Sequence, residues 1–156
     1  MILTLPEVFD LIGTIAFALS GSFVAVSKKM DIFGVNMLAV ATACGGGLVR
    51  DLVIGNTPPV VFRDPFYAII AIAVANTVFI LIKQQRHLPK KMAHLYDRTV
   101  FWFDTIGLAA FTVDGLMVGV NAGYQENVFL IVFLGFTTGV GGGVLRDVFA
   151  DQIPDI

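Results

Sequence analysis

Long, mostly apolar stretches alternate with short polar ones along this chain. Four of them lack Asp, Glu, Lys and Arg altogether, namely residues 11–27, 32–49, 65–82 and 127–145. A fifth, residues 99–123, is equally apolar except for Asp104 and Asp114. Each is close to the ~20 residues that an α-helix needs to cross the ~30 Å hydrocarbon core of a bilayer. The pattern predicts an all-α membrane protein with five spans.

Composition supports lipid as the solvent. Of the 156 residues 56% are hydrophobic and 14% are charged, whereas soluble domains carry roughly a quarter charged residues. The acidic start, with Glu7 and Asp10, lacks the basic region of a cleaved signal peptide. The single Cys44 excludes a disulfide framework and a cysteine metal site. The basic residues form no stripe suited to nucleic acid, so the expected partner is a lipid bilayer.

The basic residues predict the orientation in the membrane. Lys28 and Lys29 follow the first span, and the stretch 83–98 after the third span holds five of the ten Lys and Arg residues. These segments lie on the same side of the membrane, which the excess of positive charge marks as cytoplasmic. We therefore expect a multi-pass protein of the inner (plasma) membrane, with the N-terminus outside and residues 84–98 as a cytoplasmic linker.

The chain also repeats itself. FDLIGTIAFALSG at 9–21 aligns with FDTIGLAAFTVDG at 103–115, which lies 94 residues further on. TACGGGLVRDLVIGNTP at 42–58 aligns with TGVGGGVLRDVFADQIP at 138–154, at an offset of 96. Two ordered matches of this quality indicate a duplicated unit. We predict a first three-helix repeat at 1–83 and a second, incomplete repeat at 99–156.

An odd number of spans makes successive units enter the membrane from opposite faces, so the arrangement predicted is an inverted repeat. By the offset of 96, the counterpart of the third helix should begin near position 161, whereas the sequence stops at Ile156. We interpret the chain as truncated before its sixth helix.

Each repeat carries three consecutive glycines inside its second span, and each such glycine costs ~1 kcal/mol relative to Ala in a helix. Close helix packing is one explanation. Because both triplets precede an Arg-Asp pair, we favour helices broken beside a water-filled cavity, crossing near the midplane with exposed carbonyl groups. These carbonyls and two threonines can replace part of a cation's hydration shell. The candidate pathway residues are Thr42, Gly45, Gly46, Gly47, Thr138, Gly141, Gly142 and Gly143.

The charges beside the triplets have two interpretations. Arg50–Asp51 and Arg146–Asp147 are costly near hydrocarbon, so they should face the interior of the bundle. In the first, they form a salt bridge between the repeats that fixes the crossing. In the second, they gate the pathway, and the two roles can hold together.

Three further acids lie in or next to the spans. Asp114 lies mid-span where the first repeat has Ser20, which makes it a candidate cation site or arginine partner, with a hydrogen-bonded structural acid as the alternative. Asp10 and Asp104 precede their apolar stretches and are predicted as N-caps. The sequence shows no nucleophile–base set, phosphate loop or metal-ligand cluster. We expect neither an enzyme nor a cofactor.

The doubled glycine motif also carries a family resemblance. GGGLVRD at 45–51 and GGGVLRD at 141–147, with DLIGTIAFALSG and DTIGLAAFTVDG upstream, resemble the prokaryotic trimeric intracellular cation channels. That group overlaps bacterial membrane proteins often labelled glycine transporters. The resemblance implies seven helices, a homotrimer and a pore inside each subunit, lined by second and fifth helices kinked at their glycines. It implies potassium as the permeant ion, held transiently near Gly45, Gly46, Gly141 and Gly142.

Two functions remain open from the sequence. The first is a monovalent cation channel that conducts potassium. The second is a secondary transporter of glycine or another small zwitterion, because broken helices in inverted repeats can also hold a carboxylate. An assembly protein without a pore is a third, weaker alternative.

Overall fold

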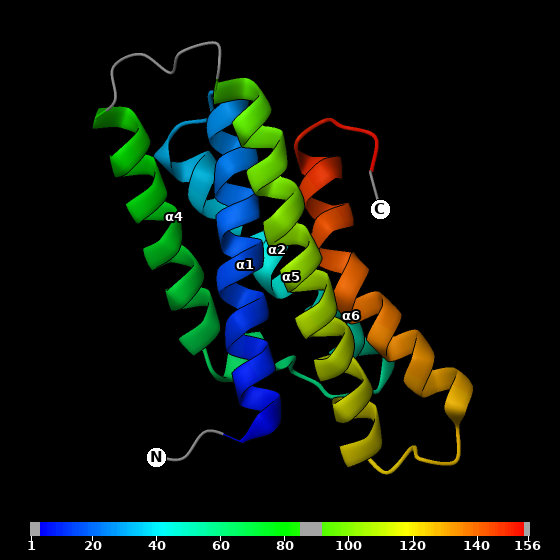
Figure 1. Ribbon diagram of the computed structural model, residues 1–156. Helices are drawn as coiled ribbons and strands as arrows, with labels where there is room; N and C mark the ends of the chain where they lie inside the picture. Colours follow the sequence, from blue (N-terminus) through cyan, green and yellow to red (C-terminus); the bar gives the residue numbers. More distant parts are fainter. Residues whose placement is uncertain (1–3, 85–91, 155–156) are drawn as a thin grey trace.

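The computed structural model describes residues 4–84 and 92–154, and in these residues the regular structure is α-helical (Figure 1). All five predicted stretches form helices, and the short α3 was not predicted. The helices are α1 (Leu5–Ser27), α2 (Ile32–Val53), α3 (Val60–Arg63), α4 (Phe66–Gln84), α5 (Met92–Asn121) and α6 (Val128–Phe149). Part of the predicted linker, residues 85–91, lies outside the described residues, and α5 begins within the remainder.

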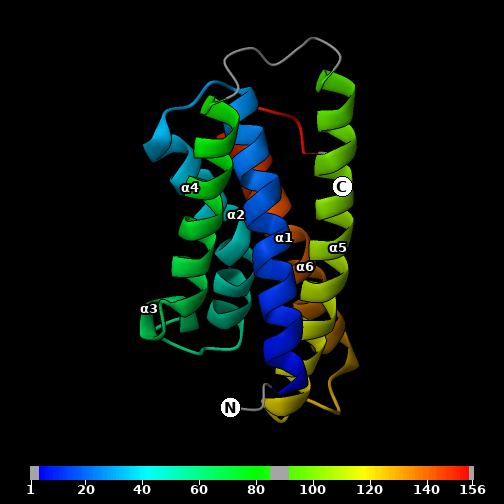
Figure 2. The same cartoon turned by 60° about the vertical axis from the view of Figure 1, so that its left-hand side comes forward.

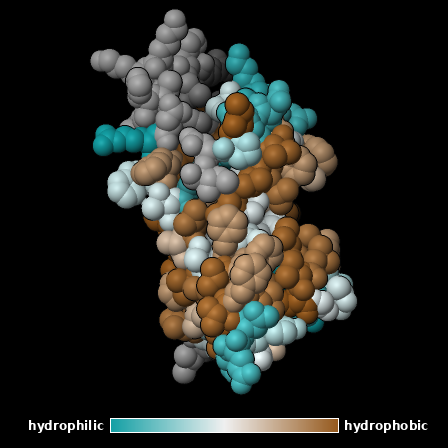
Figure 3. All heavy atoms as spheres, turned by 90° about the vertical axis from the view of Figure 1, so that its right-hand side faces the viewer, coloured by the Kyte–Doolittle hydropathy of each residue, from teal (hydrophilic) through white to brown (hydrophobic). Residues whose placement is uncertain are grey.

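Among the described residues, four helices are long and apolar enough to cross a membrane: α1, α2, α6 and the Arg98–Asn121 part of α5. The apolar part of α4, Phe66–Ile82, is shorter and falls near the lower limit of ~17 residues for a span. The count of five spans therefore stays a prediction. Figure 3 shows a broad apolar band between two polar ends. The protein is a helical membrane protein.

Four helices form the core of the bundle. Helices α1 and α5 lie side by side and run in opposite directions (Figures 1 and 2). Helix α2 packs against α1 and α6, and α6 packs against α5. Helix α4 covers one side of this core through contacts with α1 and α2. The two pairs, α1–α2 and α5–α6, thus point in opposite directions.

The two halves adopt the same local structure at equivalent positions. Helices α1 and α5 are each followed by a left-handed residue, Lys29 and Gly123, and α2 and α6 by Gly55 and Asp151. These residues allow the turn that satisfies the last carbonyl groups of each helix. The N-caps match as well, because Asp31 accepts a hydrogen bond from the Gly34 N–H at 2.8 Å and Asn127 accepts one from the Leu130 N–H at 3.0 Å. The matching pairs lie at the offsets found in the sequence.

The capping role predicted for Asp10 and Asp104 is wrong. Helix α1 begins at Leu5, where the Thr4 N–H and hydroxyl both donate to Glu7. Helix α5 begins at Met92. Both aspartates therefore lie inside helices, because the apolar pattern marks the lipid-spanning part and not the true helix start. They are free to take part in interactions inside the bundle.

The breaks predicted at the glycine triplets are also wrong. Helices α2 and α6 are continuous α-helices through both triplets. The glycines instead permit close contact, since a Cβ on Gly46 would collide with the Thr138 carbonyl group and one on Gly142 with that of Thr42. A Cβ on Gly141 would lie 3.1 Å from the Gly46 Cα. Backbone packs directly on backbone at this crossing, and a kink at the triplets stays a prediction.

This crossing predicts the effect of adding one methyl group. Gly46→Ala and Gly142→Ala should each destabilise the protein by about 1–3 kcal/mol, because the two backbones must move apart. Gly143→Ala is the matched control, since its added Cβ meets nothing within 4 Å. It should leave stability unchanged or raise it by up to about 1 kcal/mol. Thermal unfolding in detergent measures the three variants, and equal effects at the three positions would contradict the crossing.

Candidate functional site

The first buried charge cluster, here called the Arg50 cluster, joins α2 to α5. The Arg50 Nε donates to Asp51 Oδ1 at 3.0 Å, and its Nη1 donates to Asp114. All three side chains are buried. The other oxygen of Asp51 accepts the Val60 N–H at 2.8 Å, which fixes the start of α3 to the end of α2. The cluster therefore connects the first half of the chain to the second.

Helices α1 and α4 add a carboxyl and a phenol to the Arg50 cluster. Asp10 lies within electrostatic range of Arg50, Asp51 and Asp114, and its carboxyl shares a hydrogen bond with the Tyr67 side chain. Sequence reasoning missed Asp10 as a site residue. The repeat made the equivalence of Asp10 and Asp104 visible in the sequence. The assignment of both residues as N-caps hid the fact that each lies near a buried arginine.

The second cluster, here called the Arg146 cluster, joins α6 to α5 and α1. The Arg146 Nε donates to Asp147 Oδ1 at 2.7 Å, and its Nη1 donates to Asp104 at 2.5 Å. The same Nη1 donates to the Ser20 hydroxyl at 2.6 Å. Arg146, Asp147 and Ser20 are buried, whereas the Asp104 side chain is 29% exposed.

The two clusters are related by the repeat, with one substitution. Arg50 and Arg146 are equivalent, and each reaches the opposite half at an equivalent position, Asp114 for Arg50 and Ser20 for Arg146. The Arg50 cluster consequently has one carboxyl group more than the Arg146 cluster. Asp114 is thus a partner of an arginine, one of the roles considered for it. The Arg50–Asp114 and Arg146–Ser20 contacts each join one repeat to the other.

Burial explains why each guanidinium has several partners. Removing an unpaired charge from water costs several kcal/mol, so buried arginines require acceptors around the whole fork. Each arginine here binds the aspartate next to it in sequence and at least one group on another helix. Such pairs hold α2 and α6 in register with α5. A gating role for them stays a prediction.

Between the clusters, Thr42 and Thr138 are buried at the crossing of α2 and α6. The Thr42 and Thr138 hydroxyls donate to Leu38 and Leu134 carbonyl oxygens of their own helices, both at 2.6 Å. The carbonyl groups of these threonines pack against the glycines of the opposite helix. These two carbonyl groups therefore face the opposite helix, and a polar path lined by carbonyl groups stays a prediction.

The remaining predicted glycines differ in their surroundings. A Cβ on Gly45 would collide with the Leu145 side chain, and one on Gly47 would lie 3.5 Å from the Arg50 guanidinium. Gly143 has no such neighbour. The triplets thus bring Gly45, Gly46, Gly141 and Gly142 to the crossing, while Gly47 lies beside the Arg50 cluster and Gly143 lies away from both.

These features define the class of the protein as a polytopic helical membrane protein with charges buried between repeated helices. The chain belongs to the glycine transporter family, which it matches over residues 7–83 and 101–156. It is 38% identical over 147 residues to a UPF0126 membrane protein of Deinococcus radiodurans, covering 94% of this chain and 64% of that protein. It is equally similar to the UPF0126 inner membrane protein YadS of Escherichia coli K12, of which it covers 67%.

A solved structure shares the fold. The TRIC trimeric intracellular cation channel orthologue from Rhodobacter sphaeroides superposes with a TM-score of 0.85 at 32% sequence identity. The match covers 99% of this chain and 74% of that protein. The family resemblance noted in the sequence is thereby confirmed. The chain spans less than two thirds of the length of the Deinococcus relative.

The Arg50–Asp114 pair predicts strong coupling. Arg50→Met and Asp114→Leu should each destabilise the protein by about 3–5 kcal/mol, because each leaves one buried charge without its partner. The double variant should lose much less than the sum of the two. A double-mutant cycle of unfolding free energies measures this coupling. Arg63→Met is the control, since Arg63 is exposed and bonds Asn56, and it should change stability by no more than about 0.5 kcal/mol. Additive losses would show that the pair does not interact.

Proposed function

We propose that the protein is a monovalent cation channel that conducts potassium through the interior of each protomer. The observation that carries this proposal is the likeness to the Rhodobacter TRIC cation channel, with a TM-score of 0.85 and 32% identity over nearly the whole chain. The pathway proposed runs between α2 and α6, from the Arg50 cluster to the Arg146 cluster. These two helices are the ones that the family resemblance assigns to the pore.

The interior charges favour cations. Carboxyl groups outnumber guanidinium groups in the two clusters, with Asp10, Asp51, Asp104, Asp114 and Asp147 around Arg50 and Arg146. Acidic groups inside a membrane protein lower the energy of a passing cation and raise that of an anion. The surplus is greater in the Arg50 cluster.

The described arrangement corresponds to a closed pathway. The backbones of α2 and α6 touch at Gly46 and Gly142, which leaves no room for an ion. Opening requires the two helices to separate at this crossing. Glycine contacts suit such a motion, since at Gly46 and Gly142 backbone meets backbone and fewer side chains must unpack.

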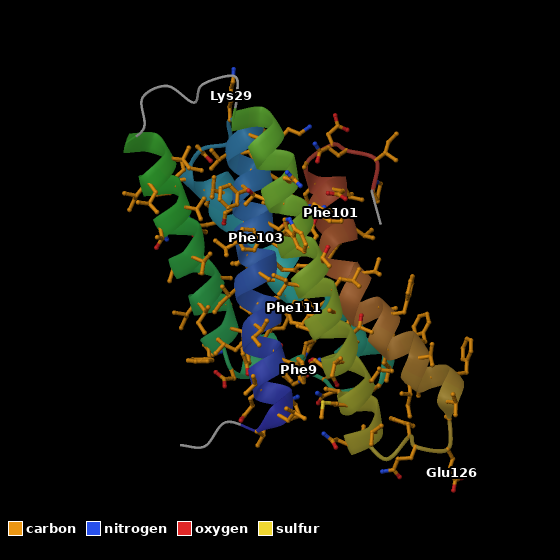
Figure 4. The ribbon with its side chains drawn as sticks, in the orientation of Figure 1. Phe9, Lys29, Phe101, Phe103, Phe111 and Glu126 are labelled. Atoms are coloured by element: carbon orange, nitrogen blue, oxygen red, sulfur yellow. The ribbon has the colours of Figure 1, made fainter. Side chains whose placement is uncertain are left out.

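The proposal includes the surroundings of the channel. Lys29 lies at one end of the bundle and Glu126 at the other, with the N-terminus at the Glu126 end (Figures 1 and 4). The positive-inside rule then places the Lys29 end in the cytoplasm and the N-terminus outside. We propose an inner-membrane homotrimer, because the similar Rhodobacter protein is an orthologue of the trimeric intracellular cation channels. The inverted-repeat scheme with a sixth and a seventh helix belongs to the same proposal.

Transport of glycine is the alternative, and the clusters give it less support. A zwitterion needs a cationic group that is available to its carboxylate. Both buried arginines are already bound by aspartates. An amino acid would have to displace these carboxylates, whereas a cation can use them as they are.

The complete protein reconstituted in lipid bilayers tests the proposal. In a KCl gradient the current should reverse near the potassium equilibrium potential, because the acidic interior admits cations and rejects chloride. The double variant Asp10→Asn with Asp114→Asn should shift the reversal potential towards zero. Protein-free bilayers are the control. Saturable glycine uptake without any cation-selective current would instead establish the transporter.

A further inference from the structure

Two phenylalanines meet at the centre of the four core helices. The rings of Phe17 on α1 and Phe111 on α5 pack edge to face, with their centroids 5.2 Å apart. Both side chains are almost fully buried, at 2% and 4% exposure. Neither ring belongs to the Arg50 cluster or the Arg146 cluster.

Glycines on three helices make room for these rings. A Cβ on Gly107 would collide with the Phe17 ring, and one on Gly13 would lie 2.8 Å from the Phe111 ring. A Cβ on Gly142 would lie 2.8 Å from the other edge of Phe17. The Phe17 ring therefore touches α5 and also the glycine of α6 that forms the crossing with α2. The aromatic pair and the glycine crossing make up one constriction.

The pair lies between the two charge clusters. On α1, Asp10 precedes Phe17 by seven residues and Ser20 follows it by three, which correspond to about 10 Å and 4.5 Å along the helix. On α5, Asp104 precedes Phe111 by seven residues and Asp114 follows it by three. Because α5 runs in the opposite direction to α1, the order of the two clusters along it is reversed. In Figure 4, Phe111 lies between Phe9 and Phe103, which are the sequence neighbours of Asp10 and Asp104. A path that runs between α2 and α6 past Gly142 therefore meets the Phe17 ring, which packs on Phe111.

We infer that the Phe17–Phe111 pair is the hydrophobic constriction that closes the pathway between the two charge clusters. Narrow apolar segments block ions because water does not remain in them, and an ion without water pays its full dehydration energy. The clusters supply hydrated, charged ends, and the rings supply the dry barrier between them. This inference rests on the proposed function, since a barrier has meaning only if ions pass.

The test is potassium flux from liposomes that contain the complete protein with Phe17→Ala or Phe111→Ala. Loss of either ring should widen and hydrate the constriction, so flux should rise by roughly an order of magnitude over the unsubstituted protein. Phe23→Ala is the matched control. Phe23 stacks on Phe103 between the same two helices, with centroids 6.1 Å apart, but outside the segment between the clusters. It should leave flux unchanged.

A second substitution covers the case in which the alanine variants do not fold. Phe111→Leu keeps an apolar side chain of similar volume and loses the flat ring, so flux should rise less than for alanine. Size-exclusion chromatography identifies the folded variants.

The outcomes separate the two claims. If the unsubstituted protein conducts and the folded ring variants conduct equally or less, the constriction is overturned while the channel stands. A rise in Phe23→Ala equal to that in the ring variants also overturns it. If neither the protein nor any variant conducts, the channel and the constriction both fail. A silent parent with conducting ring variants supports both.

Discussion

The direct contact of two helix backbones at Gly46 and Gly142 is the constraint on which the rest of this structure depends. Each glycine lies against the carbonyl group of a threonine on the opposite helix, so α2 and α6 approach more closely than side chains permit. On each helix an Arg-Asp pair follows the glycine triplet. The close approach therefore places the two Arg-Asp pairs on opposite sides of one crossing. The positions of both charge clusters follow from it.

The buried charges then fix the helices around that crossing. A guanidinium in the bundle must be paired, and its partners come from α5 and α1 because those helices flank the crossing. The clusters are thus both structural and electrostatic features. They hold the repeats together and also give the interior an excess of carboxyl groups on either side of an apolar centre.

Much of this was predictable from the sequence. The periodic apolar stretches identified the helices, and the two offsets identified the repeat whose caps and left-handed turns match in three dimensions. The continuity of α2 and α6 through the triplets was not predictable, because glycine permits both a break and a close contact, and only the neighbouring helix decides between them. Asp10 was misread for a related reason. Helix α1 begins at Leu5, ahead of Glu7 and Asp10, so the first residue of the uncharged stretch does not mark the start of the helix.

If the protein is a channel as proposed, ions should pass only when α2 and α6 separate at their crossing. The most direct test is potassium flux through the complete protein carrying Gly45→Cys and Leu145→Cys, with Cys44→Ala to remove the native thiol. A Cβ at position 45 would meet the Leu145 side chain, so the two new thiols lie close enough to be joined by oxidation. We expect the disulfide to abolish flux and a reductant to restore it. Equal flux in the oxidised and reduced proteins, with the cross-link verified, would contradict the claim.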